Sequence, residues 1–305
     1  MTQLSKLLVA TDGSENSDYA LNVATKISEK YSSRIDLIHI MQPQGTISSA
    51  APLVDPVIGG ATIIVPSQGG NSDGKKESLD GKNKATQLLE SRLKILRDRN
   101  FDSDVLFIES PDIPGEILKA SRNGHYDLVV LGSRGMSGLK SLILGSVSTK
   151  VAKEAKCSVL VMKKRIEGVF KILLGFDGSA ESRRALEFVA DFGKRLNAEV
   201  DPLSVVNLPM APEGIVGAEV DRWEREMKKV ADEAASTLSS RGIRSAGKVS
   251  NYMDVSRALS DEAERGAYDL IVVGNRGLGK LRSLFLGSVA AGVSNSAKTN
   301  VLIVR

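Results

Sequence analysis

The chain is poor in the residue types that build disulfide frameworks and metal centres. Its 305 residues include one cysteine and two histidines. A single cysteine excludes an internal disulfide, and two histidines leave little material for a metal site. Aromatic residues make up only 4% of the sequence. We therefore expect cores of Val, Leu, Ile and Ala, a composition typical of buried parallel strands.

Long hydrophobic runs and clustered charge are also absent. No stretch approaches the ~20 apolar residues that a membrane-spanning helix needs, and the apolar run near the N-terminus is too short for the core of a signal peptide. The net charge of +4 is spread along the chain rather than gathered in a basic stripe. These absences predict a cytoplasmic protein without membrane insertion and without a nucleic-acid partner.

A pattern of glycine and serine occurs twice, each time directly after an apolar run. The copies read LVVLGSRGMSGLKSLILGSVSTKV and LIVVGNRGLGKLRSLFLGSVAAGV. Each has the spacing Gly-x2-Gly-x9-Gly-Ser. The positions are Gly132, Gly135, Gly145 and Ser146 in the first copy, and Gly274, Gly277, Gly287 and Ser288 in the second. Identical spacing in both copies indicates an internal duplication rather than a chance match.

The duplication extends over the whole chain. Each half begins with an apolar run that ends in Asp-Gly-Ser, at Asp12 and at Asp177, and then alternates strand-like and helix-like patterns. This alternation predicts an α/β fold of two tandem, doubly wound, parallel five-stranded sheets with helices on both faces. We place the two domains at residues 1–164 and 169–305. Their closing strands are short apolar edges, which we expect to pair across the halves.

The first half is longer than the second between its Asp-Gly-Ser turn and its glycine pattern. The extra residues belong to a segment of about 43–82 that is rich in Gly, Ser and Pro. This composition predicts a mobile loop inserted into the first domain. Its apolar stretch ATIIVP could instead pack on a partner or cover a ligand site.

The glycine loops lie where an open parallel sheet binds ligands, beyond the carboxyl ends of strands at which the strand order reverses. Glycine lets the backbone approach a ligand closely, and the N–H groups that open a helix favour phosphate. We interpret both loops as phosphate sites. An alternative stays open, in which the glycines serve close packing and the serines cap helices. The sequence GxxxxGK[ST] is absent, which excludes the usual P-loop.

The glycine pattern, the aspartate that closes the first strand and the apolar closing strand together resemble the universal stress protein family. The resemblance covers nearly the whole chain as two tandem domains, and it implies a Rossmann-like fold of the adenine nucleotide alpha hydrolase type. Family members with this loop typically bind ATP, with which Mg could be associated. The binding residues that the resemblance implies are Thr11, Asp12, Ile40, Gly132, Gly135, Gly145, Ser146, Val147 and Ser148 in the first half, and Asp177, Val205, Gly274, Gly277, Gly287, Ser288 and Val289 in the second.

By this resemblance, Asp12 and the backbone near Ile40 hold the adenine end, while the glycines, Ser146 and Ser148 contact ribose and phosphates. Two replacements separate the halves. Ala290 stands where the first half has Ser148, and Phe176 stands where it has Thr11. A lost hydroxyl and a ring that could fill the adenine region predict that the second half binds nucleotide weakly or serves as a structural partner.

No catalytic base, nucleophile or metal cluster accompanies the loops in the sequence. His39 has no acid or nucleophile partner at useful spacing, so we expect it to be packed. The predicted function is therefore an ATP-binding, nucleotide-responsive stress regulator that pairs its own halves and can form a further homodimer. Two alternatives stay open, a slow ATPase or nucleotide-transferring enzyme, and a ligand-free dimeric scaffold.

Overall fold

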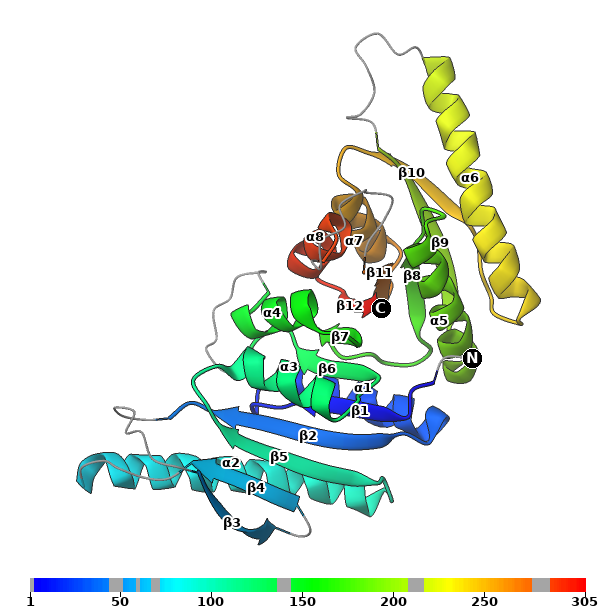
Figure 1. Ribbon diagram of the computed structural model, residues 1–305. Coiled ribbons are helices and arrows are strands. Elements are labelled where there is room, and N and C mark those ends of the chain that lie inside the picture. The colour runs from blue at the N-terminus through cyan, green and yellow to red at the C-terminus, as the bar shows by residue number, and fades with distance from the viewer. Residues whose placement is uncertain are drawn as a thin grey trace.

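The computed structural model describes residues 3–43, 52–58, 61–66, 72–135, 144–207, 217–275 and 286–305. Within them the strands form one twelve-stranded sheet in the order β10-β9-β8-β11-β12-β7-β6-β1-β2-β5-β4-β3 (Figure 1). In none of these ranges does a helix combine the length and the apolar character that crossing a bilayer requires.

The first half forms a parallel sheet in the order β5-β2-β1-β6-β7. Successive strands are added on one side of β1 and then on the other, so the strand order reverses beside β1. Its strands are β1 (Lys6–Ala10), β2 (Arg34–Met41), β5 (Ser103–Glu109), β6 (Leu128–Gly132) and β7 (Ser158–Met162). Its helices are α1 (Glu15–Tyr31), α2 (Ser72–Asp98), α3 (Ile113–Asn123) and α4 (Ser146–Glu154).

The second half repeats this topology in the order β10-β9-β8-β11-β12, again with parallel pairing. Its strands are β8 (Lys171–Gly175), β9 (Glu199–Asn207), β10 (Lys248–Tyr252), β11 (Leu270–Gly274) and β12 (Asn300–Val304). Its helices are α5 (Ala180–Leu196), α6 (Gly217–Ser240), α7 (Val255–Arg265) and α8 (Ser288–Ser296). The predicted fold class, two doubly wound parallel α/β units, is confirmed.

The closing strands pair with each other, as the sequence predicted. β7 and β12 run antiparallel, and Val161 faces Val301, Leu160 faces Leu302 and Val159 faces Ile303. The two five-stranded sheets are therefore not separate, because this pairing merges them into one continuous sheet.

The extra segment of the first half contains regular structure, which corrects the expectation of a loop over about 43–82. β3 (Pro52–Ile58) and β4 (Ala61–Pro66) form an antiparallel hairpin, and β4 adds to the sheet beside β5. The apolar stretch ATIIVP is β4 itself. Its β-branched residues favour a strand despite the surrounding glycines and prolines.

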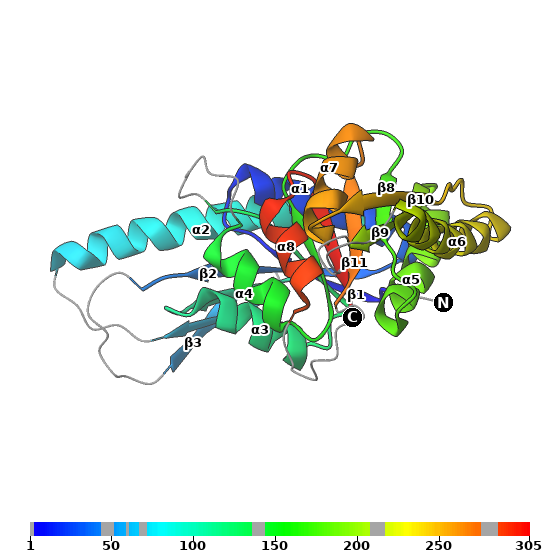
Figure 2. The ribbon, with the colours of Figure 1, turned by 90° about the horizontal axis from the view of Figure 1, so that it is seen from above.

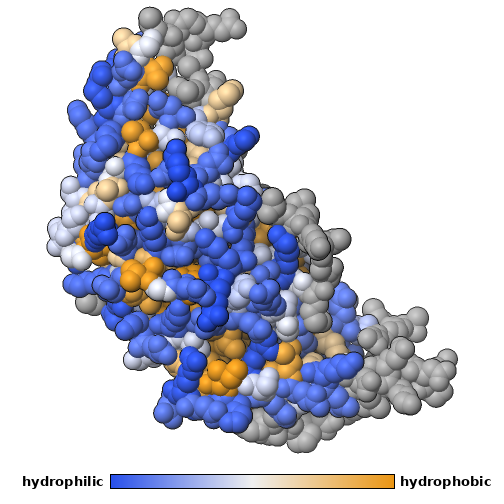
Figure 3. Space-filling model, turned by 180° about the vertical axis from the view of Figure 1, so that it is seen from behind, coloured by the Kyte–Doolittle hydropathy of each residue, from blue (hydrophilic) through white to orange (hydrophobic). Residues whose placement is uncertain are grey.

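Helices cover both faces of the sheet (Figures 1 and 2). On one face, a single buried cluster runs through both halves beneath α1, α2, α5 and α6. On the other face, α3 and α4 cover a cluster of the first half, whereas α7 and α8 cover a second cluster. The surface seen from behind is mostly hydrophilic, with scattered hydrophobic residues (Figure 3).

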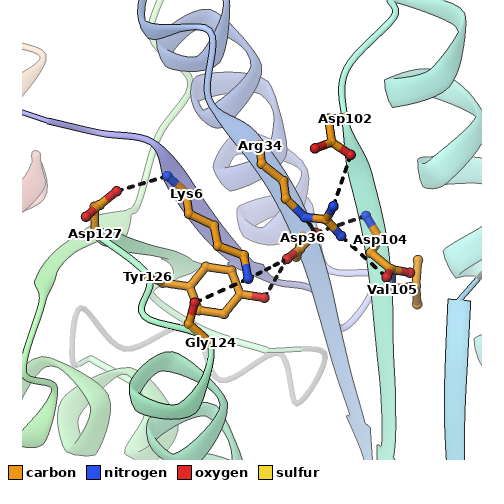
Figure 4. A network of polar contacts seen from close by, with 9 residues as sticks. All are labelled: Lys6, Arg34, Asp36, Asp102, Asp104, Val105, Gly124, Tyr126 and Asp127. Carbon is orange, nitrogen blue, oxygen red and sulfur yellow. Dashed lines mark hydrogen bonds and ion pairs between the residues drawn. The ribbon is translucent and has the colours of Figure 1, made fainter.

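A buried polar network holds the amino ends of the first-half strands together (Figure 4). The carboxylate of Asp36 on β2 is 3% exposed and accepts a hydrogen bond of 2.6 Å from the Tyr126 hydroxyl and one of 2.8 Å from Arg34 Nε. Lys6 Nζ lies 3.5 Å from the same carboxylate and 4.3 Å from the centre of the Tyr126 ring. Burial and the bond to Asp36 raise the pKa of Tyr126.

The second half builds an equivalent contact at its own amino edge. The Tyr268 hydroxyl donates to Asp201 Oδ2 over 2.6 Å, and Lys171 Nζ lies 4.9 Å from the centre of the Tyr268 ring. Buried charges need such partners, since an unpaired one would be costly. The polar anchoring of both halves therefore lies at the edge opposite to the one where the glycine loops begin.

The Tyr126 hydroxyl should contribute measurably to stability. Tyr126→Phe removes one donor from buried Asp36, and we expect it to lower the free energy of unfolding by about 1–2 kcal/mol. Tyr252→Phe is the matched control, because that hydroxyl also meets a carboxylate, Asp261, but at an exposed site. It should change stability by less than about 0.5 kcal/mol. Urea unfolding measures both, and equal effects would contradict the role of burial.

Candidate functional site

The carboxyl edge of the first-half sheet brings together two of the predicted motifs. Asp12 follows β1, and Gly132 ends β6, the strand that pairs with β1. The strand order reverses here, so the helix after β1 and the helix after β6 lie on opposite faces. This divergence of neighbouring connections is the position at which open α/β sheets bind ligands.

Asp12 shapes the turn that leads into α1. Its Oδ1 accepts hydrogen bonds from the backbone N–H of Ser14 at 3.0 Å and from the Ser14 hydroxyl at 2.6 Å. Gly13 has a φ of 88°, which suits glycine. The other carboxylate oxygen faces Gly135, where an added Cβ would lie 2.5 Å from Oδ2. Gly135 therefore lets the glycine loop approach the aspartate.

The first glycine of each pattern serves close packing. A Cβ on Gly132 would lie 2.8 Å from Asn16 Cβ and 2.9 Å from the Asn16 carbonyl carbon. A Cβ on Gly274 would lie 2.8 Å from the backbone oxygen of Glu181. In both halves the end of the strand thus touches the first turn of the helix that follows the neighbouring strand, α1 in the first half and α5 in the second. The packing role that the sequence left open applies to these two positions.

The third glycine of each pattern opens a helix without a side-chain cap. Gly145 precedes α4 with φ −65° and ψ 156°, and Gly287 precedes α8 with φ −62° and ψ 153°. Neither helix start has a capping side-chain hydrogen bond. The other helices with described N-caps are capped by side chains, those of Ser14, Asp112, Ser179 and Asp254. Among the described residues, the first N–H groups of α4 and α8 therefore lack the side-chain partner that helix starts usually have.

Ser148 braces the loop from within. Its side chain is 2% exposed, and its hydroxyl donates to the backbone oxygens of Ser133 at 2.9 Å and Gly145 at 3.0 Å. The Ser133 oxygen also accepts the N–H of Gly145 at 2.8 Å. The hydroxyl that we predicted to contact phosphate is thus directed at the loop backbone, whereas Ser146 is exposed at the first position of α4.

The second half closes its loop without this hydroxyl. Ala290 is buried where Ser148 lies in the first half, yet the N–H of Gly287 still donates to the backbone oxygen of Asn275 at 2.8 Å. The two N-cap glycines have nearly the same backbone angles. Ala290 therefore lacks the hydrogen bonds that Ser148 makes to the loop backbone, but the start of α8 keeps nearly the same backbone conformation.

Four partly buried aliphatic side chains, which we call the rim, lie at the carboxyl ends of β2 and β5 and at the starts of α3 and α4. Ile40 is the last residue but one of β2, and Ile108 lies opposite it on β5. Ile113 starts α3, and Val147 lies in the first turn of α4. All four pack against the same buried cluster. The sequence predictions included Ile40 and Val147 but missed Ile108 and Ile113. The strand register, which pairs Ile108 with Ile40, was the signal that could have found Ile108.

The second half has a corresponding rim of smaller side chains. Val205, Val255 and Val289 are partly buried against one cluster. Ser250 faces Val205 across the β9–β10 pair, in the place that Ile108 has in the first half. The second rim consequently offers less apolar surface and is more polar.

Thr11 and Phe176 do not lie on the rims, which corrects two expectations. Phe176 is 4% exposed and belongs to the cluster beneath α5 and α6, so its ring does not fill the region beside α8. The hydroxyl of Thr11 is buried and lies 3.4 Å from that of Ser17 on α1. Alternation along a strand directs both side chains to the face opposite α4 and α8.

His39 is packed, as predicted. Its ring stacks on Phe107 with centroids 5.8 Å apart, and Nδ1 lies 2.8 Å from the carbonyl oxygen of Thr11. Burial lowers the pKa of the imidazole. Gly277 lies outside the described residues. Within those residues, no group of three or more His, Cys, Asp or Glu side chains could hold a metal ion.

The packing role of Gly132 gives a direct prediction. Gly132→Ala should lower the free energy of unfolding by about 1–3 kcal/mol, because the new methyl group meets the backbone of α1 rather than a flexible side chain. Gly217→Ala is the control, since a Cβ there meets nothing within 4 Å. Thermal and urea unfolding compare the two. An equally small effect of both changes would contradict the close contact.

Comparison with known proteins shows what this arrangement is similar to. The sequence model of the Universal stress protein family matches residues 63–163 and again residues 169–305. A universal stress protein of Mycolicibacterium smegmatis is 26% identical, over 98% of this chain and 96% of that protein. Universal stress protein YxiE of Bacillus subtilis is 27% identical, and 99% of it aligns with 52% of this chain.

The fold is shared as well. A crystal structure of a universal stress protein from Archaeoglobus fulgidus matches 100% of this chain and 97% of its own, with a TM-score of 0.63 and 21% sequence identity. The likeness extends over both halves rather than over one domain.

Proposed function

The chain belongs to the universal stress protein family, and we propose that it binds ATP or another adenine nucleotide at the carboxyl edge of each half. One observation carries this proposal. Within the described residues the start of α4 has no side-chain cap, and partly buried aliphatic side chains of β2, β5 and α3 pack against the same cluster as Val147 in its first turn. Such a site offers hydrogen-bond donors to phosphate at one end and an apolar surface to a base at the other.

The phosphate end consists of backbone groups. Thr149 donates its N–H to the oxygen of Gly145, so the N–H groups of residues 146–148 precede the first intrahelical bond. These donors and the positive end of the helix dipole favour an anion. A single hydrogen bond is worth only about 1 kcal/mol net, and micromolar affinity requires about 8 kcal/mol. Phosphate contacts alone are therefore too weak.

The aliphatic rim supplies the missing part of the affinity. Burying a planar base against Ile40, Ile108 and Val147 removes apolar surface from water. Asp12, which Ser14 orients through Oδ1, lies at the same edge and can accept hydrogen bonds from a ribose. Mg would arrive with the nucleotide phosphates, since this cation is usually held by substrate phosphates and few protein groups.

Both halves take part in the proposed binding. The two reasons for a much weaker second site were Phe176 and Ala290, and neither side chain obstructs the start of α8. The difference lies in the rim, where Ser250 replaces Ile108. We expect two nucleotides per chain, of which the second is bound more weakly.

The proposed signal is the presence of bound nucleotide rather than its hydrolysis. Asp12, the acidic side chain beside the glycine loop, is tied to Ser14 and oriented by it, an arrangement that suits ligand positioning better than proton abstraction. The proposed role is therefore a nucleotide-responsive stress regulator. Release of ADP that depends on added metal would instead favour a slow ATPase.

A charge placed at the start of each helix tests the two sites separately. Ser146→Asp puts a carboxylate at the first position of α4, where it favours the helix dipole but repels phosphate. It should weaken ATP binding in the first half at least about tenfold. Ser288→Asp should do the same in the second half. Calorimetric titration with ATP and Mg should then show one site instead of two.

The control is Ser146→Ala, which removes the hydroxyl and keeps the backbone donors. It should change the affinity by less than about threefold, because a neutral hydrogen bond is weak in water. Unchanged binding in both aspartate variants would contradict the placement of phosphate at these helices.

A further inference from the structure

The residues that follow the two closing strands occupy equivalent positions. Lys163 follows β7, and Arg305 follows β12. Because β7 and β12 are antiparallel neighbours, each strand ends beside the other half of the chain. The backbone N–H of Lys163 donates to Asn300, the first residue of β12, at 2.7 Å. The N–H of Arg305 donates to Ser158, the first residue of β7, at 3.3 Å.

Each side chain reaches the C-terminal end of the helix that follows the glycine loop of the other half. Lys163 Nζ donates to the backbone oxygens of Ser294 at 2.6 Å and Ala297 at 2.5 Å, in the last turn of α8. Arg305 Nη2 donates to the oxygen of Ala152 at 2.6 Å, in the last turn of α4. The first half thus caps the helix of the second, and the second half caps the helix of the first.

The two capped helices also contact each other. They lie side by side (Figures 1 and 2), and Ala152 of α4 belongs to the buried cluster that includes Val293 and Ala297 of the second half. Each helix is a rigid element of nine residues, about 13 Å long. The cation at its C-terminus is therefore one short helix away from the proposed phosphate at its N-terminus, and both charges act on the same dipole.

We propose that Lys163 and Arg305 are positioning residues that couple the two nucleotide sites, because each fixes the phosphate-binding helix of the other half. This inference rests on the proposed function. A phosphate that draws α4 toward itself must move Arg305 and β12, and one that draws α8 must move Lys163 and β7. Binding in one half is thereby transmitted to the other through the central pair of strands.

The charge of the first glycine loop also acts on the cap of α8. Burial, and the nearby charge of Arg134 in that loop, lower the pKa of Lys163 to about 8. At pH 7 Lys163 therefore remains mainly protonated and can donate to the backbone oxygens of α8.

The test measures each site alone in the full-length chain. Ser146→Asp leaves only the second site able to bind ATP, and Ser288→Asp leaves only the first. In the Ser146→Asp background, Lys163→Met should weaken ATP binding about three- to tenfold, because α8 loses its cap, and Lys163→Arg should restore most of the affinity. In the Ser288→Asp background, Arg305→Met should have the same effect, and Lys163→Met should change the affinity by less than twofold.

Lys164→Met is the matched control, because Lys164 also donates across the halves, to the oxygen of Tyr268 at 2.9 Å, but caps neither helix. It should leave both affinities unchanged. A loss of affinity in the half that carries the substitution, or equal losses in both, would overturn the crossed assignment. Absence of ATP binding in both backgrounds would overturn the proposed function, and the inference with it.

Hydrogen exchange without nucleotide tests the caps themselves. Lys163→Met should speed exchange in the last turn of α8 at least about fivefold and leave α4 unchanged, and Arg305→Met should do the reverse. This result supports the crossed caps even where ATP binding fails. Unchanged exchange in both variants would overturn them even where binding is intact.

Discussion

The antiparallel pairing of β7 with β12 is the contact on which the rest of the structure depends. It joins two parallel sheets that would otherwise each end in an exposed apolar edge, and such an edge would invite pairing with other chains. The same pairing brings α4 and α8 together and lets Lys163 and Arg305 reach across. The short β7–β12 pairing thus joins the cores of the two halves and fixes how the two candidate sites lie relative to each other.

The two edges of the sheet have opposite chemistry. At the amino edge, Asp36 and Asp201 are paired with tyrosine hydroxyls and lie close to lysines, so the polar groups there are engaged. At the carboxyl edge, α4 and α8 begin without side-chain caps, beside aliphatic side chains. Paired polar groups thus lie at the first edge, and the candidate binding site lies at the second.

The sequence predicted the fold because the fold depends on local, repeated patterns. Apolar runs that end in Asp-Gly-Ser define strand and helix starts, and the duplicated loop indicates the edge at which we place the candidate site. Side-chain direction was less predictable. Phe176 lies on the opposite face of the sheet from the one we expected, and the Ser148 hydroxyl is directed at the loop backbone. The face to which a strand residue points and the course of a loop depend on tertiary packing. Ile108, Ile113 and the crossed caps depend on contacts between segments far apart in the sequence.

The central claim is that both halves hold an adenine nucleotide at the start of the helix that follows the glycine loop. Mass spectrometry of the small molecules released from the purified protein, with the molar ratio of nucleotide to chain, tests it most directly. The account predicts an adenine nucleotide whose ratio approaches two per chain when ATP is supplied in excess. A protein that releases no nucleotide, and retains none after incubation with ATP and Mg, would contradict the account.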